Sequence, residues 1–500
     1  MQFTTAGFWI FFAAVFCVYY LVRPAWRWVV LLAASLYFYA ALGAPQLIVA
    51  LALVTGISYI VGRVLAGSSA KSAKRKVILW LGVLLNLAVL IIIRYLPILI
   101  KGLVLFPYLA SLPNLAISVG VSFYVFQAIS YLIDIYYEEI PAESHFGYFS
   151  LSISFFPKLL QGPIERASIL LPQLHKPKAL TDEMIRSALL LFAWGLFKKV
   201  VIADRLGILV GAVYDNLPQY TGASLWLATF YYALQIYCDF SGYTDMAIGL
   251  ARLLGINLSI NFNKPYLAVS IADFWRRWHI SFSSWIFDYI FKPLQMNLRR
   301  WKIWASPAAL LVTFFLSGIW HGASWGFVIW GLLHGIYMAA YALLAPCEKK
   351  FLRRFNLEKS IVVRFVRIVF TFLLVCFAWI FFRAKTLTDG WYVASHLFTG
   401  WDFITRLING FTHHGLAIAG TGIGLQQILT FNIPIPDLIF AAIGVLVLLA
   451  VELPENLANS RMGIAFQKYT VFRWFVYWLL AISILALGTM VQTGFVYFQF

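Results

Sequence analysis

The sequence is poor in charged residues. Of its 500 residues only 12% are Asp, Glu, Lys or Arg, whereas about a quarter are charged in an ordinary soluble domain. Hydrophobic residues make up 62% of the chain, and apolar segments of about 20 residues, the length that spans a bilayer, recur from one end to the other. This composition excludes a soluble globular protein. It predicts an all-α polytopic membrane protein, because helices satisfy their own backbone hydrogen bonds in lipid.

Cysteine is scarce, and several catalytic motifs are missing. The cysteines form no CxxC pair, so neither a disulfide framework nor a metal site is expected; they are Cys17, Cys238, Cys347 and Cys376. His413 and His414 are adjacent but lack further ligands, which is more typical of a solvated loop than of a metal site. The chain has no P-loop and no H-E-x-x-H, which argues against an ATP-driven pump and a zinc protease.

Long apolar segments predict roughly eleven to thirteen transmembrane or re-entrant helices in a single membrane domain over 1–500. The expected spans are 8–22, 27–43, 46–66, 77–100, 115–137, 186–213, 222–253 (long enough for two pieces), 304–322, 323–345, 361–383, 436–452 and 472–492, with shorter apolar pieces at 147–160 and 281–293. A more polar connection over 384–437 is expected to be a loop or a set of short interfacial helices. The first segment lacks a basic n-region and a cleavage site, so it is expected to be retained.

The net charge of +18 comes from clusters of Lys and Arg beside the apolar segments. No nucleic-acid-binding motif accompanies them, so membrane lipids with anionic headgroups are the expected partners, and nucleic acid is not. Basic residues lie between spans one and two and after span three, whereas the loop AALGAPQ between spans two and three has none. Because basic loops stay in the cytoplasm, this pattern predicts an extracytoplasmic N-terminus in a multi-pass membrane protein.

Polar and ionisable residues enter the apolar segments in the central third of the chain. The stretch IYCDFSGYTDMAIGLARLLG (236–255) contains Asp239, Asp245 and Arg252. Charges at membrane depth are costly, so they line a cavity or pair with one another. A structural ion pair between Asp245 and Arg252 explains two of them at least as well as a functional role does, whereas Asp239 fits either interpretation.

The next stretch, NFNKPYLAVSIADFWRRWHISFSSWIFDYIFKPL (261–294), has an amphipathic pattern. Pro265 ends one segment, and Asp273 is expected to start or cap the next. A helix over 273–287 would place Arg276, His279 and Ser283 along one side. Its aromatic stripe consists of Trp275, Trp278, Phe282 and Trp285. An interfacial helix accounts for the tryptophans and arginines but gives no reason for His279.

A histidine also occurs in SGIWHGASW (317–325), deep in a predicted span. Gly318 and Gly322 flank His321, so one side of the helix has little bulk and lets another backbone or a substrate approach. A neutral imidazole in a dry tunnel accepts a proton near neutral pH, which favours a functional role over a hydrogen bond between helices. His334 follows 13 residues later on another helix face, and for it the structural role is favoured.

Four motifs together strongly resemble those of the membrane-bound O-acyltransferase (MBOAT) superfamily: FFPKLLQGPIERASILLPQL (155–174), CDFSGYTDMAIGLARLLGINL, DFWRRWHISFSSW and GIWHGASWGFVIWGLLHG. The chain looks most like the bacterial surface-polymer branch, which includes the alginate O-acetyltransferase membrane component and, more distantly, the teichoic-acid D-alanyl transfer protein. After DYIFKPL, alginate-type members usually continue with a Gly-Gly-Asn-Arg-like loop, whereas this chain reads QMNLRRWK. The total length favours the alginate, cellulose or peptidoglycan subgroup over the shorter D-alanyl one. Alginate is therefore the expected polymer, and cellulose, peptidoglycan and D-alanylated teichoic acid are the alternatives. The resemblance to this branch also implies the bacterial inner membrane.

The resemblance implies helices around a central funnel, with a catalytic core over 155–335. It assigns the catalytic role to His321 in the WHG motif and a supporting role to His279. The other candidates for lining the funnel or binding substrate are Trp278, Arg276, Ser283, Trp320, Asp239 and Lys158.

An O-acyltransferase of this kind is expected to take its acyl group from acetyl-CoA or an acylated carrier protein, with no permanently bound cofactor and no metal. Its hydroxyl acceptor lies outside the cytoplasm. The chain has no G-x-S-x-G elbow of its own, so an extracytoplasmic acyl-accepting partner resembling SGNH hydrolases is expected between it and the polysaccharide. A transporter or an export scaffold is the alternative of a different class, although the polar motifs gather in one block rather than in two related halves.

Overall fold

The structure is a computed structural model that describes residues 1–69, 72–102, 120–322, 324–399, 433–454, 468–489 and 495. Regular secondary structure within these ranges is helical, without a strand. Six helices in the described chain are long and apolar enough to cross a membrane: Pro45–Ala66, Ala73–Arg94, Arg299–His321, Trp325–Arg354, Ile361–Arg383 and Thr470–Leu487. The expected all-α polytopic class is confirmed.

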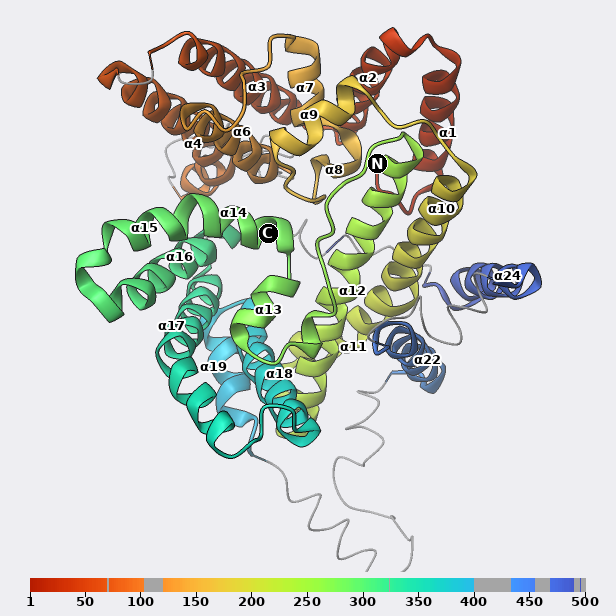
Figure 1. Cartoon of the computed structure of the whole chain (residues 1–500). Coiled ribbons are helices and arrows are strands. Elements are labelled where there is room, and N and C mark those ends of the chain that lie inside the picture. The colour runs from red at the N-terminus through yellow and green to blue at the C-terminus, as the bar shows by residue number, and fades with distance from the viewer. Residues whose placement is uncertain are drawn as a thin grey trace, which may run out of the picture. The chain divides into compact units, whose positions relative to one another are not determined.

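The chain divides into two compact units, Met1–Trp194 with Tyr243–Asn261, and Gly195–Gly242 with Phe262–Phe500. The first contains α1 (Ala6–Leu21), α2 (Arg27–Ala40), α3 (Pro45–Ala66), α4 (Ala73–Gly102), α6 (Val121–Tyr136), α7 (Phe146–Ser154), α8 (Phe156–Leu159) and α9 (Ala167–His175). The second contains η2 (Lys198–Ala203), α11 (Asp204–Tyr214), η4 (Pro265–Leu267), α13 (Ile271–Arg277), α14 (Ile280–Ile286), η5 (Phe287–Phe291), α15 (Lys292–Asn297), η6 (Arg299–Trp304), α16 (Ala305–His321), α17 (Trp325–Arg354), α18 (Ile361–Arg383), α19 (Leu387–His396), α22 (Ile435–Glu452) and α24 (Thr470–Leu487). The residues of α10 (Asp182–Phe197) and α12 (Ala223–Leu253) are divided between the units (Figure 1).

Each expected span overlaps a helix. The segment 222–253, which is long enough for two pieces, is one continuous helix, α12. The shorter apolar pieces are also helical, as α7 and α8 and as α14 to α15. The more polar connection begins with α19, and its residues 400–432, which include His413 and His414, lie outside the described residues.

Small residues and paired polar groups bring the helices of the first unit together. Gly62 of α3 lies against the ring of Tyr131 in α6, where a Cβ atom would come within 2.8 Å of it. Asn86 of α4 is fully buried, and its Nδ2 donates to Ser58 Oγ of α3 at 3.1 Å. In a membrane segment such close approach and interhelical hydrogen bonding replace the hydrophobic driving force that packs helices in water.

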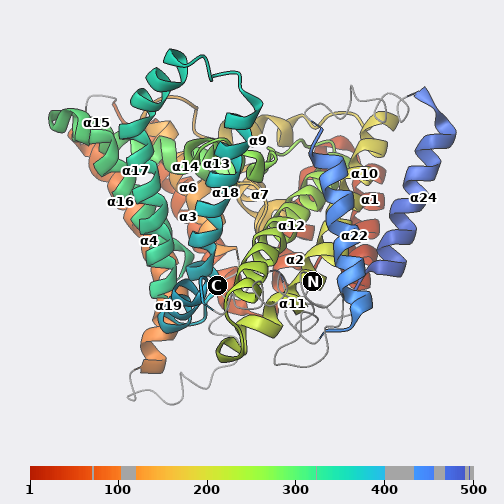
Figure 2. The same cartoon turned by 90° about the horizontal axis from the view of Figure 1, so that it is seen from below.

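In the second unit α16 and α17 form a tight antiparallel hairpin, side by side in both Figure 1 and Figure 2. A Cβ atom on Gly318 would lie 2.5 Å from the carbonyl oxygen of Phe327, and one on Gly331 would lie 2.4 Å from that of Phe314. The glycine side of the WHG segment therefore contacts the backbone of α17. Of the two expected neighbours, another backbone or a substrate, the structure shows the backbone. Gly326 gives α18 the same close access, with the Phe381 oxygen 2.4 Å from its would-be Cβ.

Three local expectations were wrong. The segment 273–287 is two short helices, α13 and α14, and not one, because the chain leaves the helical conformation at Trp278 and His279. His321 is the last residue of α16 and lies at the end of its span rather than deep within it. No ion pair joins Asp245 to Arg252 among the described residues; they are two turns apart on continuous α12, too far for neighbouring positions on a helix face.

Candidate functional site

The first part of the site is the break between α13 and α14. Trp278 is extended (φ −100°, ψ 126°), and His279 is left-handed (φ 45°, ψ 54°), a conformation that L residues seldom adopt. Hydrogen bonds hold the break on both sides. Asn263 N donates to Arg277 O at 2.9 Å, and Ser283 donates from Oγ to Trp278 O at 2.9 Å and from N to His279 O at 2.8 Å.

Rings from two helices enclose His279, which is only 1% exposed. The imidazole meets Phe240 of α12 edge to face at 4.7 Å and lies 5.1 Å from Phe282 of α14. Burial lowers the pKa of His279 to about 3, because the charged imidazolium would lose its hydration. His279 is therefore neutral at pH 7 and suited to hydrogen bonding rather than to collecting a proton.

The second part of the site is His321, which is 5% exposed at the C-terminal end of α16. Its ring lies 4.5 Å from Trp320, 4.8 Å from Trp330 of α17 and 5.0 Å from Phe382 of α18. The imidazole of His321 therefore ends a helix and is enclosed by aromatic rings from α16, α17 and α18.

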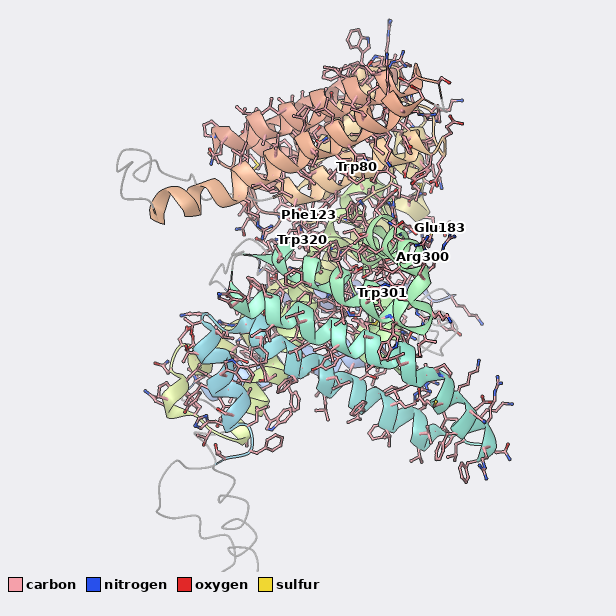
Figure 3. The ribbon with its side chains drawn as sticks, turned by 90° about the vertical axis from the view of Figure 1, so that its left-hand side faces the viewer. Trp80, Phe123, Glu183, Arg300, Trp301 and Trp320 are labelled. Atoms are coloured by element: carbon pink, nitrogen blue, oxygen red, sulfur yellow. The ribbon has the colours of Figure 1, made fainter. Side chains whose placement is uncertain are left out.

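A single aromatic ring connects the two histidines. Phe282 lies 5.1 Å from His279, stacks on Trp320 at 4.3 Å and reaches His321 at 6.4 Å. The structure thus brings together the RWH and WHG motifs, which the sequence left as separate candidates. Trp320 is labelled in Figure 3.

Two buried polar groups near His321 have no hydrogen-bond partner in the part of the chain that the structure describes. Ser317 Oγ, one turn before it on α16, and Trp330 Nε1 are buried and make no hydrogen bond to any described residue. Most buried polar atoms in native proteins are hydrogen-bonded, so exceptions call for a ligand, water or a catalytic role. A substrate carbonyl or hydroxyl beside His321 would supply the missing partners.

His334 has the structural role that its helix face favoured. It is fully buried in α17, and its Nδ1 accepts a hydrogen bond from Trp275 Nε1 at 3.2 Å. This bond joins α13 to α17, so His334 helps to fix the segment that carries His279.

A cavity of about 240 Å³ lies beside Trp278. Tyr237 of α12 and Tyr266 of η4 line it, and their rings contact Trp278 at 6.3 and 6.1 Å. Tyr237 Oη also donates to the carboxylate of Glu452, another lining residue. Trp278 thus packs against two of the residues that line the cavity.

Asp239 belongs to a buried ion cluster in the second unit. Lys199 Nζ lies 2.7 Å from Asp204 Oδ1 and 2.7 Å from Asp239 Oδ1, and all three side chains are at most 6% exposed. Lys199 lies in η2, a π-helical turn between α10 and α11.

Arg276 was expected on the same side of a single helix as His279 and Ser283. Because the chain breaks between α13 and α14, Arg276 does not share a helix face with His279. Its side chain is exposed, and its Nε donates to Ala272 O.

Lys158 lies in the first unit, where it is fully buried. Its Nζ donates to Gln127 Oε1 and, at 3.4 Å, to Ile153 O. Burial lowers the pKa of Lys158 to about 7, although the charge of Glu165 opposes the shift. Burial in turn raises the pKa of Glu165, whose carboxylate accepts hydrogen bonds from Ser259.

Comparison with known proteins shows to which family the chain belongs. The probable alginate O-acetylase AlgI of Azotobacter vinelandii is 34% identical over 417 residues, which cover 82% of this chain and 80% of the relative. The family model of MBOAT, membrane-bound O-acyltransferase family, matches residues 137–383. The chain belongs to this family.

The O-acyltransferase assignment rests on further relatives as well. The probable alginate O-acetylase AlgI of Pseudomonas putida is 32% identical over the full length of both chains, and a peptidoglycan O-acetyltransferase of Helicobacter pylori is 37% identical over 55% of each. The matched family segment contains both His279 and His321, as well as Lys158 and Asp239. The protein is thus a membrane acyltransferase.

Several residues that surround His279 and His321 were not predicted from the sequence. Ser317 could have been found, since it precedes His321 by four residues on the same helix face. Trp330 and Phe382 follow the WHG motif on two other helices, and Phe240 precedes both histidines on α12. No local pattern joins these aromatic residues to the histidines, because only the packing of the helices does so.

Proposed function

We propose that this protein transfers an acetyl group from a cytoplasmic thioester, acetyl-CoA or an acylated carrier protein, for O-acetylation of an extracytoplasmic polysaccharide. The observation that carries the proposal is the surroundings of His321. The imidazole ends α16 within a wall of rings, beside Ser317 Oγ and Trp330 Nε1, which have no hydrogen-bond partner among the described residues. A thioester and a hydroxyl placed there would find a base and hydrogen-bond donors in a water-poor space.

In the proposed reaction His321 takes the proton from the acceptor hydroxyl. The hydroxyl oxygen attacks the thioester carbonyl carbon, a C–O bond forms, and the C–S bond breaks. The proton passes from His321 to the departing thiolate, so that the products are an ester and a thiol. The indole N–H of Trp330 is the candidate donor to the carbonyl oxygen as negative charge develops on it.

His279 has a different proposed role. Because burial lowers its pKa to about 3, it is a neutral hydrogen-bonding group that orients the acceptor or the donor near neutral pH. Ser283 holds the break that carries His279, and Trp278 packs against Tyr237, which lines the neighbouring cavity. For Lys158 and Asp239 the buried polar contacts support an assembly role more directly than substrate binding.

The relatives support alginate as the first polymer to test and peptidoglycan as the second. The alginate O-acetylases match over four fifths or more of this chain, whereas the peptidoglycan O-acetyltransferase has higher identity over a shorter region. Cellulose and, with D-alanine as the acyl group, teichoic acid are the further alternatives. An SGNH-hydrolase-like partner outside the cytoplasm is proposed to pass the acyl group on, because the chain lacks a G-x-S-x-G elbow. The proposed location is the bacterial inner membrane, with the N-terminus outside the cytoplasm.

The test is transfer of radiolabelled acetyl from acetyl-CoA to surface polysaccharide in membranes that carry the intact chain or His321→Ala. Positioned proton transfer contributes about 10²- to 10⁴-fold, so the variant should lose transfer by a factor in that range. His396→Gln is the matched control, since His396 lies in α19, away from the rings around His321, and bonds Tyr392 O. Equal labelling by the intact chain and by correctly inserted His321→Ala would refute the role of His321 and favour a transporter or scaffold.

A further inference from the structure

A second, larger concavity lies along the α16–α17 hairpin. It has a volume of about 620 Å³ and an apolar lining, formed at one end by Trp301 and Trp304 and along its length by Pro307, Ala308, Leu311, Ile336, Ala339, Ala340 and Leu343. Its depth comes from the small side chains of α16 and α17. Both helices belong to candidate membrane spans, so lipid is the solvent available to an open apolar groove on them. We call it the hairpin groove.

Basic residues stand at the tryptophan end of the hairpin groove. The η6 segment contains three exposed basic residues that flank Trp301 in the sequence: Arg299, Arg300 and Lys302. None of the three forms an ion pair with another described residue. Lys302 has a left-handed backbone (φ 51°, ψ −118°) that turns the chain between the two groove tryptophans. Figure 3 labels Arg300 and Trp301, which are consecutive residues of this segment.

The composition of this end is typical of a helix terminus at the membrane surface. Tryptophan prefers the headgroup level, and arginine and lysine there attract anionic lipids. The groove continues from this cluster along α16 towards Leu311, in the direction that an acyl chain takes from its headgroup into the bilayer. The cations and the apolar channel thus match the two halves of one anionic phospholipid.

We propose that the hairpin groove is a binding site for an anionic phospholipid, with its acyl chain along the groove and its phosphate at Arg299, Arg300 and Lys302. The site is separate from the proposed reaction centre. The groove reaches Leu311 on α16, ten residues before His321, which is roughly 15 Å at the rise of an α-helix. A lipid held there would brace the hairpin that carries His321, and the site does not depend on the acyl acceptor.

The test uses the full-length protein in phosphatidylcholine vesicles that contain a photoactivatable phospholipid with a diazirine on its acyl chain. One probe has a phosphatidylglycerol headgroup and the other a phosphatidylcholine headgroup. After illumination, mass spectrometry locates the attached lipid on the peptides. The phosphatidylglycerol probe should label 301–311 and 336–343 in preference to the phosphatidylcholine probe.

Two variants separate the halves of the site. The combined Arg299→Gln, Arg300→Gln and Lys302→Gln variant should lower the phosphatidylglycerol preference at low salt by about fivefold for each cation removed. Ala340→Trp fills the groove and should abolish labelling there by both probes. The matched control is Lys349→Gln with Lys350→Gln, which removes exposed cations from the end of α17 and should leave labelling unchanged.

Three outcomes would overturn the proposal. The first is a phosphatidylglycerol preference that is as strong outside 301–311 and 336–343 as within them. The second is equal labelling by the two headgroups, which would reduce the groove to ordinary lipid contact. The third is an equal loss of preference in the Lys349 and Lys350 control, which would show attraction by overall charge rather than by this site. Because labelling does not require acyl transfer, none of these outcomes depends on the proposed function.

Discussion

His279 combines a buried imidazole with a left-handed backbone. Its φ of 45° is uncommon for a residue with a Cβ atom, and such conformations persist where the surrounding structure over-determines them. Here Asn263, Ser283 and the ring of Phe240 supply that constraint. The sequence does not predict this conformation, because few histidines adopt it even though histidine is enriched there relative to most other residues with a Cβ atom. The backbone role and the chemical role of His279 are therefore separable by substitution.

Replacement of His279 by Asn should preserve folding, because asparagine tolerates the left-handed region, while removing the imidazole. His279→Ala should be less stable than His279→Asn by about 1 kcal/mol, since alanine is penalised there. Both variants should have reduced acetyl transfer. Thermal unfolding in detergent and the radiolabel assay measure the two effects. Equal stability of the Asn and Ala variants would contradict the backbone role.

Ser283 is predicted to position His279 through its hydrogen bond to Trp278 O. Ser283→Ala should reduce kcat for acetyl transfer with little change in KM and should cost about 1 kcal/mol in stability. Ser283→Thr, which keeps the hydroxyl, should restore kcat. Ser284→Ala is the matched control, because its exposed hydroxyl bonds Ser281 O within the same helix and no other described residue. A change in KM alone would favour substrate binding over positioning.

At the scale of elements, the α16–α17 hairpin carries His321 and brings Trp330 against it. Its geometry depends on glycines at the contact between the helices, where backbone atoms fill the space of a side chain. Such close approach permits dispersion contacts that larger residues would prevent. The GxxxG-like spacing of Gly318 and Gly322 indicated a close approach, and only the packing identified its partner as the backbone of Phe327.

Gly331→Ala should destabilise the hairpin by about 1–3 kcal/mol, because its Cβ would lie 2.4 Å from a backbone oxygen that cannot move aside. Gly56→Ala is the matched control, another glycine within a long helix but with no atom within 4 Å of its would-be Cβ. That control should be neutral or more stable by up to about 1 kcal/mol. Thermal unfolding of the two variants compares them. Equal stability would show that the hairpin can open to admit the methyl group.

For the whole molecule, the distribution of basic residues predicts the orientation in the membrane. The loop between α2 and α3 lacks charge, whereas Lys71, Lys74, Arg75 and Lys76 lie at or near the start of α4. Positive loops remain in the cytoplasm, so the α2–α3 loop and the N-terminus should face outward. This predicted orientation depends on the positions of basic residues in the sequence and not on any contact between the two compact units.

Cysteine labelling tests this orientation, in a background where the exposed native Cys17 and Cys347 are replaced by Ser. Ala41→Cys should react with a membrane-impermeant maleimide from outside the inner membrane, and Ser69→Cys should react only after that membrane is permeabilised. Both positions are exposed, so burial does not explain a difference. The reverse pattern would place the N-terminus in the cytoplasm.

The sequence by itself determined the class of protein and where most of the helices lie, and it singled out the two motif histidines. Those features depend on local composition and on helical periodicity, which neighbouring residues set. The tertiary structure alone decided where the 273–287 segment breaks, that Trp275 binds His334, and that Phe282 lies between His279 and His321. These depend on side chains far apart in the chain, whose packing no local pattern encodes.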